Sequence, residues 1–247
     1  MASKVDVDIK QLLEAGAHFG HKTSRWHPKM AQYIHSKRGD NHIIDLNYTV
    51  AGFEAALEFA ENVASKGGQV LFVSTKRQAK EIVEASAIKA GMPYVTERWL
   101  GGMLTNRNTI SVRIKHLKDL EAKMDSGELA SRYNKLEVQR FQEEIDLMNK
   151  KFGGIKDMHA RVGAVFVIDM IEDDNAIKEA TKLNIPVIAL ADTNSNPTLV
   201  KYPIPCNDDA VKTIQLACDY MVQAVEAGRA RVKEPAAKTD ATKVEAK

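Results

Sequence analysis

The fold of this chain is decided by residues 69–97, which read QVLFVSTKRQAKEIVEASAIKAGMPYVTE. Positions 69–75 form a continuous apolar run of strand length, positions 76–91 have the spacing of a helix, and positions 92–97 again suit a strand. A short apolar strand that leads through a helix into another strand is typical of a parallel sheet with helices on both faces. The stretch therefore predicts an α/β fold.

The same alternation returns in the second half of the chain, after a long interruption. Because strands and helices alternate throughout, we expect one parallel sheet whose crossover connections are right-handed. The further expected elements are helices at 8–15, 48–66, 172–184 and 208–227, strands at 163–170 and 185–193, and two short strands within 33–46.

The interruption, residues 105–152, carries a different pattern. Each of its halves places apolar residues three and four positions apart, and a turn at 125–128 separates the halves. Two such series predict an inserted antiparallel αα-hairpin with a coiled-coil-like seam. Each arm of about 20 residues would be about 30 Å long.

The domain organisation that follows from these patterns is discontinuous. The α/β domain comprises residues 1–104 and 153–228, and the inserted helical hairpin comprises residues 105–152. Residues 229–247 are poor in apolar side chains and carry six basic and three acidic residues, so we expect a disordered basic tail.

Composition excludes several classes of protein. Of the 247 residues, 44% are hydrophobic, so the chain can bury a core, and its net charge of +2 means that any basic surface must be local. Cys206 and Cys218 form neither a zinc pattern nor a disulfide framework, and we expect both thiols in the core. No secretory signal and no run of 18 apolar residues is found, so we expect a cytoplasmic protein without a membrane span.

The basic residues gather in two stretches that contain no acid. Residues 21–39 and 98–118 each carry five lysines and arginines, and each contains a tryptophan, Trp26 or Trp99. The remainder of the hairpin, residues 119–152, has six basic and eight acidic residues. Acid-free stretches beside an aromatic ring are typical of contact with a nucleic-acid backbone. A solvated face can also carry such a run by chance, and a tryptophan in an apolar run more often packs in the core.

Catalytic and metal sites find little support in the sequence. The loops expected after the strands contain no dinucleotide-binding, nucleotide-phosphate or nucleophile-elbow motif. Asp169 and Asp192 end strands and could hold a metal, but such aspartates more often cap the next turn. Five of the seven histidines fall within residues 18–42, yet no acid or cysteine lies among them at zinc spacing. We therefore expect no metal and no cofactor.

Two adjacent glycines, Gly101 and Gly102, lie within the sequence ERWLGGMLTNRNTI, residues 97–110. Glycine is required either where φ is positive or where another group approaches closer than a Cβ allows. A turn before a helix capped by Thr105 or Asn106 would satisfy the first condition. The arginine, tryptophan and amide side chains on both sides favour the second condition, with a nucleic acid as the approaching group.

A set of motifs spread along the chain resembles one protein family. The motif RWLGGMLTN (98–106) is the most specific, and it is accompanied by LLEAGAHFGH (12–21), RWHPKM (25–30), LFVSTKRQA (71–79), GGIKDM (153–158), AVFVIDM (164–170), IPVIALADTNSNP (185–197) and IPCNDDA (204–210). In this order and over residues 8–228 they resemble the bacterial small-ribosomal-subunit protein two family. The chain departs from the family at Cys206, where Gly is usual, at Asn196, where Asp is frequent, and at His27, where Asn is common.

The resemblance implies a fold, a function and a set of partners. The fold would be a flavodoxin-like doubly wound parallel sheet with the hairpin inserted. The protein would have no catalytic activity, would be a structural constituent of the small ribosomal subunit, and would be monomeric within the ribosome. It would lie on the solvent side of the subunit near the junction of head and body, bind small-subunit ribosomal RNA, and contact neighbouring ribosomal proteins. One of these would be the large mRNA-binding ribosomal protein one, which it would help to recruit during translation.

We assign RNA binding to cations that neutralise phosphates, glycines that allow close approach, polar residues beside them, and two tryptophans that either stack on a base or pack in the core. The predicted residues are Lys22, Arg25, Trp26, Lys29, Lys37, Arg38, Lys76, Arg77, Arg98, Trp99, Gly101, Gly102, Thr105, Asn106, Arg107, Arg113 and Lys115.

Two other readings of the sequence stay open. One is an α/β enzyme or sensor for a phosphorylated small molecule, with Lys76 and Arg77 at a helix N-terminus that attracts phosphate. The other is a protein-interaction module whose hairpin offers a purely apolar surface. Salt would separate these from RNA binding, because docking on phosphates weakens steeply with ionic strength and apolar docking does not.

Overall fold

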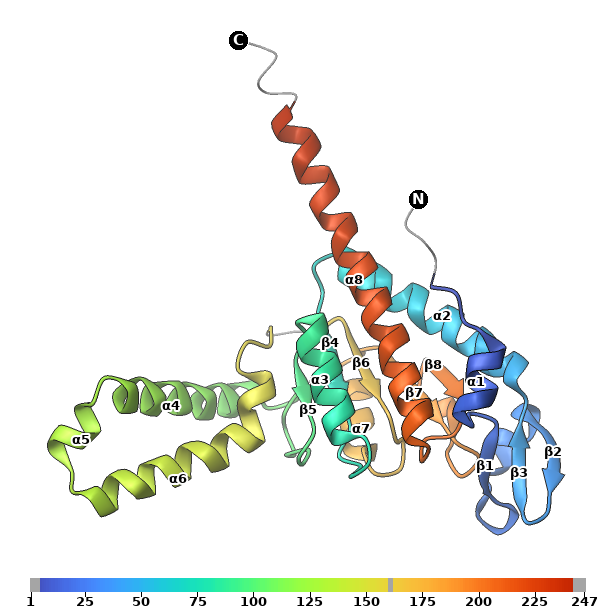
Figure 1. Cartoon of the computed structure of the whole chain (residues 1–247), viewed down its shortest axis with the longest axis horizontal. Coiled ribbons are helices and arrows are strands. Elements are labelled where there is room, and N and C mark those ends of the chain that lie inside the picture. The colour runs from blue at the N-terminus through green and yellow to red at the C-terminus, as the bar shows by residue number, and fades with distance from the viewer. Residues whose placement is uncertain (1–4, 160–161, 242–247) are drawn as a thin grey trace.

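The computed structural model describes residues 5–159 and 162–241, with side chains as far as Arg231. Its main element is a five-stranded sheet in the order β5-β4-β6-β7-β8, and all four strand pairings are parallel (Figure 1). Counted along the chain among themselves, the strands run 2-1-3-4-5, an order consistent with a flavodoxin-like sheet. The strands are β4 (Val70–Val73), β5 (Tyr94–Val95), β6 (Ala164–Val167), β7 (Val187–Ala191) and β8 (Tyr202–Pro205). The predicted α/β class and the parallel sheet are confirmed.

Two separate hydrophobic cores form because side chains along a strand point alternately to the two faces of the sheet. One face, which includes Phe72 and Phe166, packs against four helices. These are α1 (Ile9–Ala15), α2 (Leu46–Ser65), α3 (Lys80–Ala90) and α8 (Val211–Ala241). The other face, which includes Leu71 and Val165, packs against α7 (Asp174–Lys182), the loop around Trp99 and the root of the hairpin. The two cysteines are fully buried in the first core, as predicted.

A small antiparallel sheet of strand order β1-β3-β2 lies at the end of the molecule opposite the hairpin (Figure 1). Its strands β2 (Ile34–Arg38) and β3 (Asn41–Ile44) match the two strands predicted within residues 33–46. Its third strand, β1 (Phe19–Lys22), is not among the predicted strands, because the two glycines of GAHFGH were interpreted as the end of a helix. The short 3₁₀ helices η1 (Thr23–Arg25) and η2 (Pro28–Tyr33) connect β1 to β2.

The inserted segment forms three helices, of which α4 and α6 lie side by side and run in opposite directions (Figure 1). They are α4 (Arg107–Asp125), α5 (Glu128–Arg132) and α6 (Lys135–Phe152), and η3 (Gly153–Ile155) follows them. Side chains at the root of both long helices, including Ile110 and Phe152, belong to the second core together with the sheet. The predicted boundary at residues 105 and 152 therefore does not separate two cores, and the coiled-coil character of the seam stays a prediction.

Three elements differ from their predicted extent. Strand β8 is not among the predicted strands because Pro203 and Pro205 lie within it, and an edge strand is one of the few places in a sheet that tolerates proline. Helix α3 begins at Lys80 and not at 76. Helix α8 continues to Ala241, past residue 227 where the helix is predicted to end and into residues 229–247 that are predicted as a disordered basic tail, although Pro235 lies within it. Positions 242–247 of that tail lie outside the described residues.

Two arginines of α8 attach the turn that follows residue 228 to the neighbouring helices. The guanidinium of Arg229 donates hydrogen bonds to the carbonyls of Ala90 and Gly91 at the end of α3, and Arg231 pairs with Glu61 of α2 at 2.7 Å. Within the part of the chain that the structure describes, no helix is long and apolar enough to cross a membrane.

Candidate nucleic-acid interface

The first acid-free stretch lies in the small sheet and in the turns η1 and η2. Its five cations are all exposed, and Trp26 is 39% exposed beside His42. The segment is fixed against the end of β7 by Thr193, whose carbonyl accepts from the His27 backbone N–H at 2.7 Å and whose Oγ1 accepts from the His21 N–H at 2.9 Å. Gly20 permits this contact, because a Cβ there would lie 2.5 Å from the Thr193 Cγ2 atom.

The second acid-free stretch begins with a loop that wraps around one carboxylate, that of Glu179 on α7. The Glu179 Oε1 atom accepts from the Trp99 indole N–H at 3.0 Å and from the Gly102 N–H at 2.7 Å. Its Oε2 atom accepts from the Leu104 N–H at 3.0 Å and from both the N–H and the hydroxyl of Thr105 at 3.1 Å. The loop is therefore an anion cradle, but the anion comes from the same chain.

The two glycines of this loop have different roles. Gly102 has φ +90°, a left-handed conformation that favours glycine, and its N–H points to Glu179. Gly101 has no positive φ, is exposed, and a Cβ built on it would meet no atom within 4 Å. The turn therefore explains Gly102, whereas nothing within the described chain requires glycine at position 101.

Trp99 and Arg107 are predicted to contact RNA, and both are instead used inside the protein. The Trp99 side chain is only 8% exposed, lies in the second core and donates to Glu179, so it is not available to stack on a base. The Arg107 Nη2 atom donates to the carbonyls of Met158 at 3.0 Å and His159 at 2.8 Å, and burial lowers the pKa of its guanidinium. Arg107 thereby ties the start of α4 to the segment that returns to the sheet.

Lys76 is a third predicted RNA contact whose side chain the structure places inside the protein. Its ammonium lies 3.1 Å from Asp169, 2.7 Å from Asp208 and 2.7 Å from Asp209, and the residue is 7% exposed. It also precedes α3 by four positions, so it does not occupy a helix N-terminus. Its neighbour Arg77 is exposed. Because three carboxylates surround the Lys76 ammonium, the local charge does not attract a phosphate.

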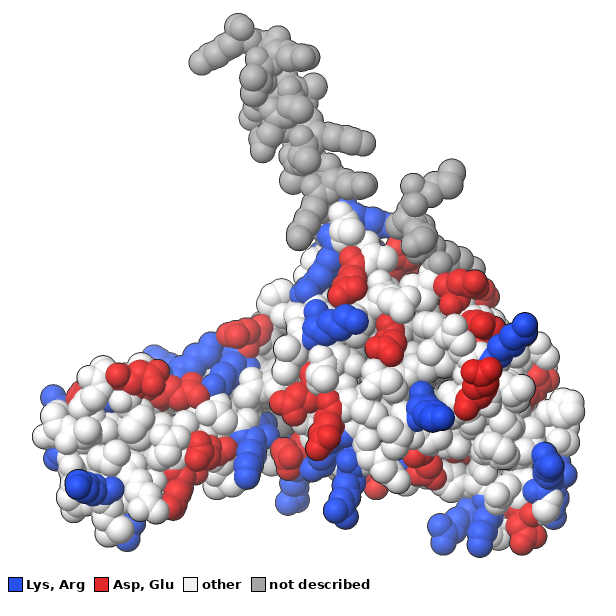
Figure 2. Space-filling view, viewed as in Figure 1, with Lys and Arg blue, Asp and Glu red and all other residues white. Residues whose placement is uncertain are grey.

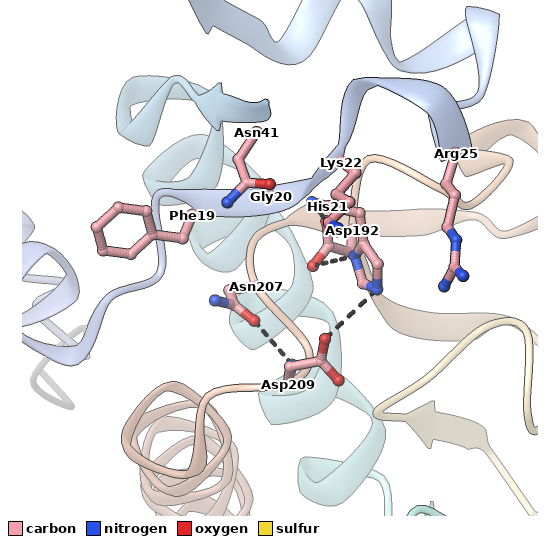
Figure 3. A pocket seen from close by; sticks show the side chains of 9 residues that line it. All are labelled: Phe19, Gly20, His21, Lys22, Arg25, Asn41, Asp192, Asn207 and Asp209. Carbon is pink, nitrogen blue, oxygen red and sulfur yellow. Dashed lines mark hydrogen bonds and ion pairs between the residues drawn. The ribbon is translucent and has the colours of Figure 1, made fainter. Parts of the chain in front are cut away.

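The carboxyl ends of the strands, where sheets of this type hold ligands, are occupied by this internal ion-pair cluster. The adjacent cavity has a volume of about 370 Å³, and His21 lies in it between Asp192 and Asp209 (Figure 3). The His21 Nδ1 atom is 3.1 Å from Asp192, and this hydrogen bond raises the pKa of the imidazole against the effect of its burial. No loop of described residues around the cavity pairs a nucleophile with a base.

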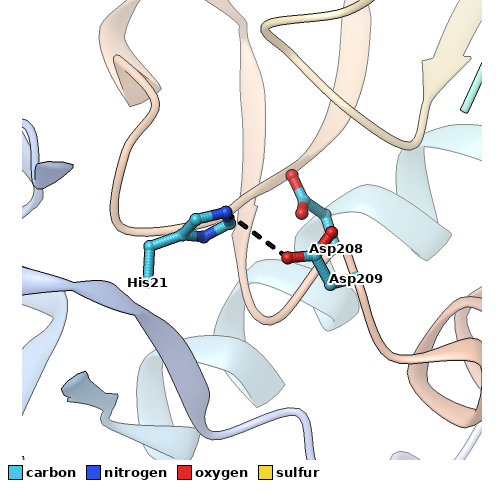
Figure 4. Close-up of side chains that lie close together, drawn as sticks. All are labelled: His21, Asp208 and Asp209. Atoms are coloured by element: carbon cyan, nitrogen blue, oxygen red, sulfur yellow. Dashed lines mark ion pairs between the residues drawn. The ribbon is translucent and has the colours of Figure 1, made fainter.

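Among the described residues, a possible cation site is formed by His21, Asp208 and Asp209, whose ligand atoms lie within 4.8 Å of one another (Figure 4). The Lys76 ammonium already contacts both aspartates, so a metal would have to displace it or share them. Asp169 accepts from the backbone N–H groups of Ile171 at 2.7 Å and Glu172 at 3.0 Å, which is the capping role expected of an aspartate after a strand.

Most of the predicted RNA-contact residues lie on the surface. Lys and Arg side chains project along the lower edge of the view in Figure 2, beneath the parallel sheet and the small sheet, while the hairpin shows both charges. Thr105 and Asn106 are exposed beside the loop, and Asn106 is the N-cap residue of α4, as one of the two predicted alternatives has it, although its side chain accepts from the Thr109 hydroxyl and not from a helix N–H. The exposed predicted residues are Lys22, Arg25, Trp26, Lys29, Lys37, Arg38, Arg77, Arg98, Gly101, Thr105, Asn106, Arg113 and Lys115.

The residues that the sequence did not reveal are the ones that hold the two basic stretches in place, Glu179 and Thr193. Each lies more than 70 positions from the backbone groups that it binds. No local signal marks either of them, because a glutamate on an amphipathic helix and a threonine after a strand are common in any α/β fold.

Comparison with known proteins matches nearly the whole chain to one family. The family model of ribosomal protein S2 matches residues 12–228. The small ribosomal subunit protein uS2 of Thermus thermophilus is 48% identical over 231 residues, which cover 94% of this chain and 90% of that protein. The proteins of the same name from Chloroflexus aggregans and Fusobacterium nucleatum are 47% and 43% identical, over 91% and 97% of this chain and 94% and 97% of their own. The chain belongs to the ribosomal protein S2 family.

Membership of this family makes the chain a structural constituent of the small ribosomal subunit, with a role in translation and without catalytic activity. Two of the three residues at which the chain departs from the pattern of the resemblance accept a local backbone hydrogen bond. The His27 Nδ1 atom accepts from the Lys29 N–H at 3.2 Å, and the Asn196 Oδ1 atom accepts from the Thr198 N–H at 3.2 Å, as an asparagine or aspartate would. The third, Cys206, is fully buried in the first core.

Proposed function

We propose that this S2-family chain binds small-subunit ribosomal RNA by docking on its phosphate backbone. Eight of the nine exposed predicted cations carry the proposal, because they form neither an ion pair nor a side-chain hydrogen bond with any of the residues that the structure describes, whereas the ninth, Lys29, donates to the Thr198 hydroxyl at 2.9 Å. Nearby cations outside this set do find acids, as Lys80 does with Glu97 and Lys118 with Asp157. The eight are Lys22, Arg25, Lys37, Arg38, Arg77, Arg98, Arg113 and Lys115.

Unpaired cations on a chain of nearly neutral net charge favour a polyanionic partner. The chain as a whole has a net charge of +2, so it carries nearly as many acids as cations, yet among the described residues no acid forms an ion pair with these side chains. Exposed cations that keep their charge free can neutralise phosphates and release counterions, which supplies affinity independent of sequence. Gly101, which has open space where a Cβ would lie, offers a point where an RNA backbone can approach the loop.

The proposal extends to partners and place. The hairpin, with a coiled-coil seam between α4 and α6, would present a stiff surface to RNA or to neighbouring ribosomal proteins. Recruitment of the mRNA-binding ribosomal protein one rests on the family resemblance alone. The protein would act as a single copy on each ribosome in the cytoplasm.

Sedimentation of the purified chain with small ribosomal subunits that lack it tests the docking mechanism. We expect the chain to travel with the subunits at moderate salt and to be released at high salt. The variant Arg98→Glu, which changes an exposed side chain, should be released at moderate salt while it unfolds at the same denaturant concentration as the wild type. A chain that runs free at every salt concentration, or an Arg98→Glu variant that stays bound, would refute phosphate docking.

A second candidate function, the binding of a phosphorylated small molecule beside Lys76, loses its main support. Lys76 forms ion pairs with the three carboxylates around it. Helix α3 begins four residues after Lys76, so the N-terminus of α3 does not lie at that position. The reading of the hairpin as a purely apolar interaction module is disfavoured by the exposed Arg113 and Lys115 at the root of α4.

A further inference from the structure

The loop of residues 98–105 contains backbone N–H groups that converge on one point, which is the geometry of an anion site. A phosphate of RNA would be the expected occupant in a protein that docks on nucleic acid. The occupant is instead the Glu179 carboxylate, which accepts from three backbone N–H groups, one indole N–H and one hydroxyl at 2.7–3.1 Å.

Glu179 is itself firmly placed. Its neighbours on α7, Ala176, Ile177 and Ala180, are buried in the second core against the sheet. Burial opposes ionisation of Glu179, but the hydrogen bonds from Trp99 and from the loop amides outweigh it and lower the pKa of the carboxyl group. The loop is therefore attached to the rigid part of the fold through a carboxylate that stays charged at neutral pH.

The consequence concerns the outer side of the loop. With its N–H groups turned inward to Glu179, the loop directs Gly101 and the Arg98 side chain to solvent. We propose that Glu179 is a positioning residue for RNA binding: it fills the anion cradle from within and so holds Arg98 and Gly101 in the conformation that meets the RNA backbone. This inference rests on the proposed function.

The positioning role can be distinguished from a simple effect of charge, because the two predict opposite changes in RNA affinity when the charge of Glu179 is removed. Removal of a negative charge beside an RNA-binding surface strengthens binding if only the charge matters. Removal of a positioning carboxylate weakens binding, because only a fraction of the molecules then present the competent loop and the apparent affinity falls by that fraction. The variant Glu179→Gln keeps the size of the side chain, removes the charge, and cannot accept all five hydrogen bonds.

The matched control is Glu97→Gln, which makes the same change of charge at the residue directly before the loop. Glu97 is exposed and pairs with Lys80 at 3.2 Å, and its carboxylate accepts no hydrogen bond from the loop backbone among the described residues. We expect Glu97→Gln to bind small subunits as tightly as the wild type or more tightly. For Glu179→Gln we expect binding about tenfold weaker, as for a loop that is competent in about one molecule in ten.

The experiment measures occupancy of the full-length chain on depleted small ribosomal subunits for the wild type, Arg98→Glu, Glu179→Gln and Glu97→Gln. If the wild type binds, Arg98→Glu is lost and Glu179→Gln binds like Glu97→Gln, the positioning role is refuted while RNA docking stands. If the wild type does not bind, or Arg98→Glu binds like the wild type, docking itself fails, and the positioning role fails with it.

Amide hydrogen exchange on the free protein supplies a second readout, which does not depend on binding. Glu179→Gln should speed exchange at Gly102, Leu104 and Thr105 and leave the amides of β4 and α8 unchanged. Unchanged protection of the loop would overturn the proposal. Should the variant fail to fold, the wild type answers the same question, since protection of these three amides should be lost as the pH falls through the lowered pKa of Glu179, before the sheet opens.

Discussion

Lys76 is a buried cation that links separate elements of the fold through ion pairs. Burial by itself would lower the pKa of its ammonium, but Asp208, Asp209 and Asp169 outweigh that effect and raise the pKa above its ordinary value. The cation thereby joins the ends of β4 and β6 to the turn before α8. Arg77, the next residue, is exposed and has no such partners among the described residues.

We expect Lys76→Met to lower the free energy of unfolding by about 3–5 kcal/mol, because a buried ion pair that loses one partner leaves uncompensated charge. The matched change Arg77→Ala removes an exposed cation and should shift stability by less than about 0.5 kcal/mol. Denaturant unfolding of the two variants checks the pair. Equal stabilities would contradict the assignment of Lys76 to the interior.

Asp173 should make stability depend on pH. Burial raises the pKa of this carboxyl group to about 6 from 3.8, although Thr75 donates two hydrogen bonds to it. The folded protein therefore binds this proton more tightly than the unfolded chain, so the group costs stability above about pH 6 and this cost is removed as the pH falls towards 4. The free energy of unfolding of Asp173→Asn relative to that of the wild type should thus fall by about 2–3 kcal/mol between pH 7 and pH 4. A difference that does not change with pH would contradict this.

The individual roles of these residues could be predicted only in part. The sequence correctly indicates which stretches are basic, because charge runs are local. It does not distinguish Lys76 from Arg77, since the acids that surround Lys76 lie 93 and 132 positions away, and only the folded sheet brings them together. Glu179 escapes prediction for the same reason: its five donors belong to a loop 74–80 positions earlier in the chain.

At the scale of elements, the hairpin is attached to the sheet in three ways. Its root side chains lie in the second core, Arg107 binds the returning segment, and Lys156 pairs with Glu121 of α4 at 2.6 Å. At the far end, Asn134 and Glu137 form a capping box that begins α6. The hairpin therefore shares its core with the sheet at the root and relies on local contacts at its tip.

Two leucines of the hairpin test whether its root contributes more to stability than its exposed surface does. Leu117 on α4 is 0% exposed and Leu136 on α6 is 60% exposed. Leu117→Ala should lower the free energy of unfolding by about 2–5 kcal/mol, because it opens a cavity in a core shared with the sheet. Leu136→Ala should change it by less than about 0.5 kcal/mol. Denaturant unfolding followed on the whole protein measures both. A small effect of Leu117→Ala would mean that the hairpin folds as a separate unit.

Elements with strong periodicity were predictable, and the others were not. The apolar runs of β4, β6 and β7 have the length of buried strands, and the two series of the inserted segment have the spacing of helices, although the second series is divided between α5 and α6. Strand β8 contains two prolines, so only its place at the edge of the sheet makes it a strand. The end of α8 is helical without an apolar stripe, and hydrophobic periodicity has nothing to detect in such a segment.

Across the whole molecule, seven of the eight cations that carry the proposal lie on two separate parts of one scaffold, and the eighth, Arg77, follows β4. The small sheet and η1 carry one group, and the loop after β5 together with the root of α4 carries the other; Figure 1 shows these elements at separate places in the fold. Thr193, which follows β7, holds the first group in place, and Glu179 of α7 holds the loop of the second. The near-neutral chain thus presents local basic surfaces at defined places, which suits a protein that is fitted onto a folded RNA.

The measurement that tests this account most directly is the effect of Gly101→Ala on binding to small ribosomal subunits and on stability. No atom lies within 4 Å of the added methyl group and φ is not positive, so the free protein should be as stable as the wild type or slightly more stable. If an RNA backbone approaches Gly101 as proposed, the same methyl group should weaken subunit binding about tenfold or more. Wild-type binding by a fully stable Gly101→Ala protein would contradict the account.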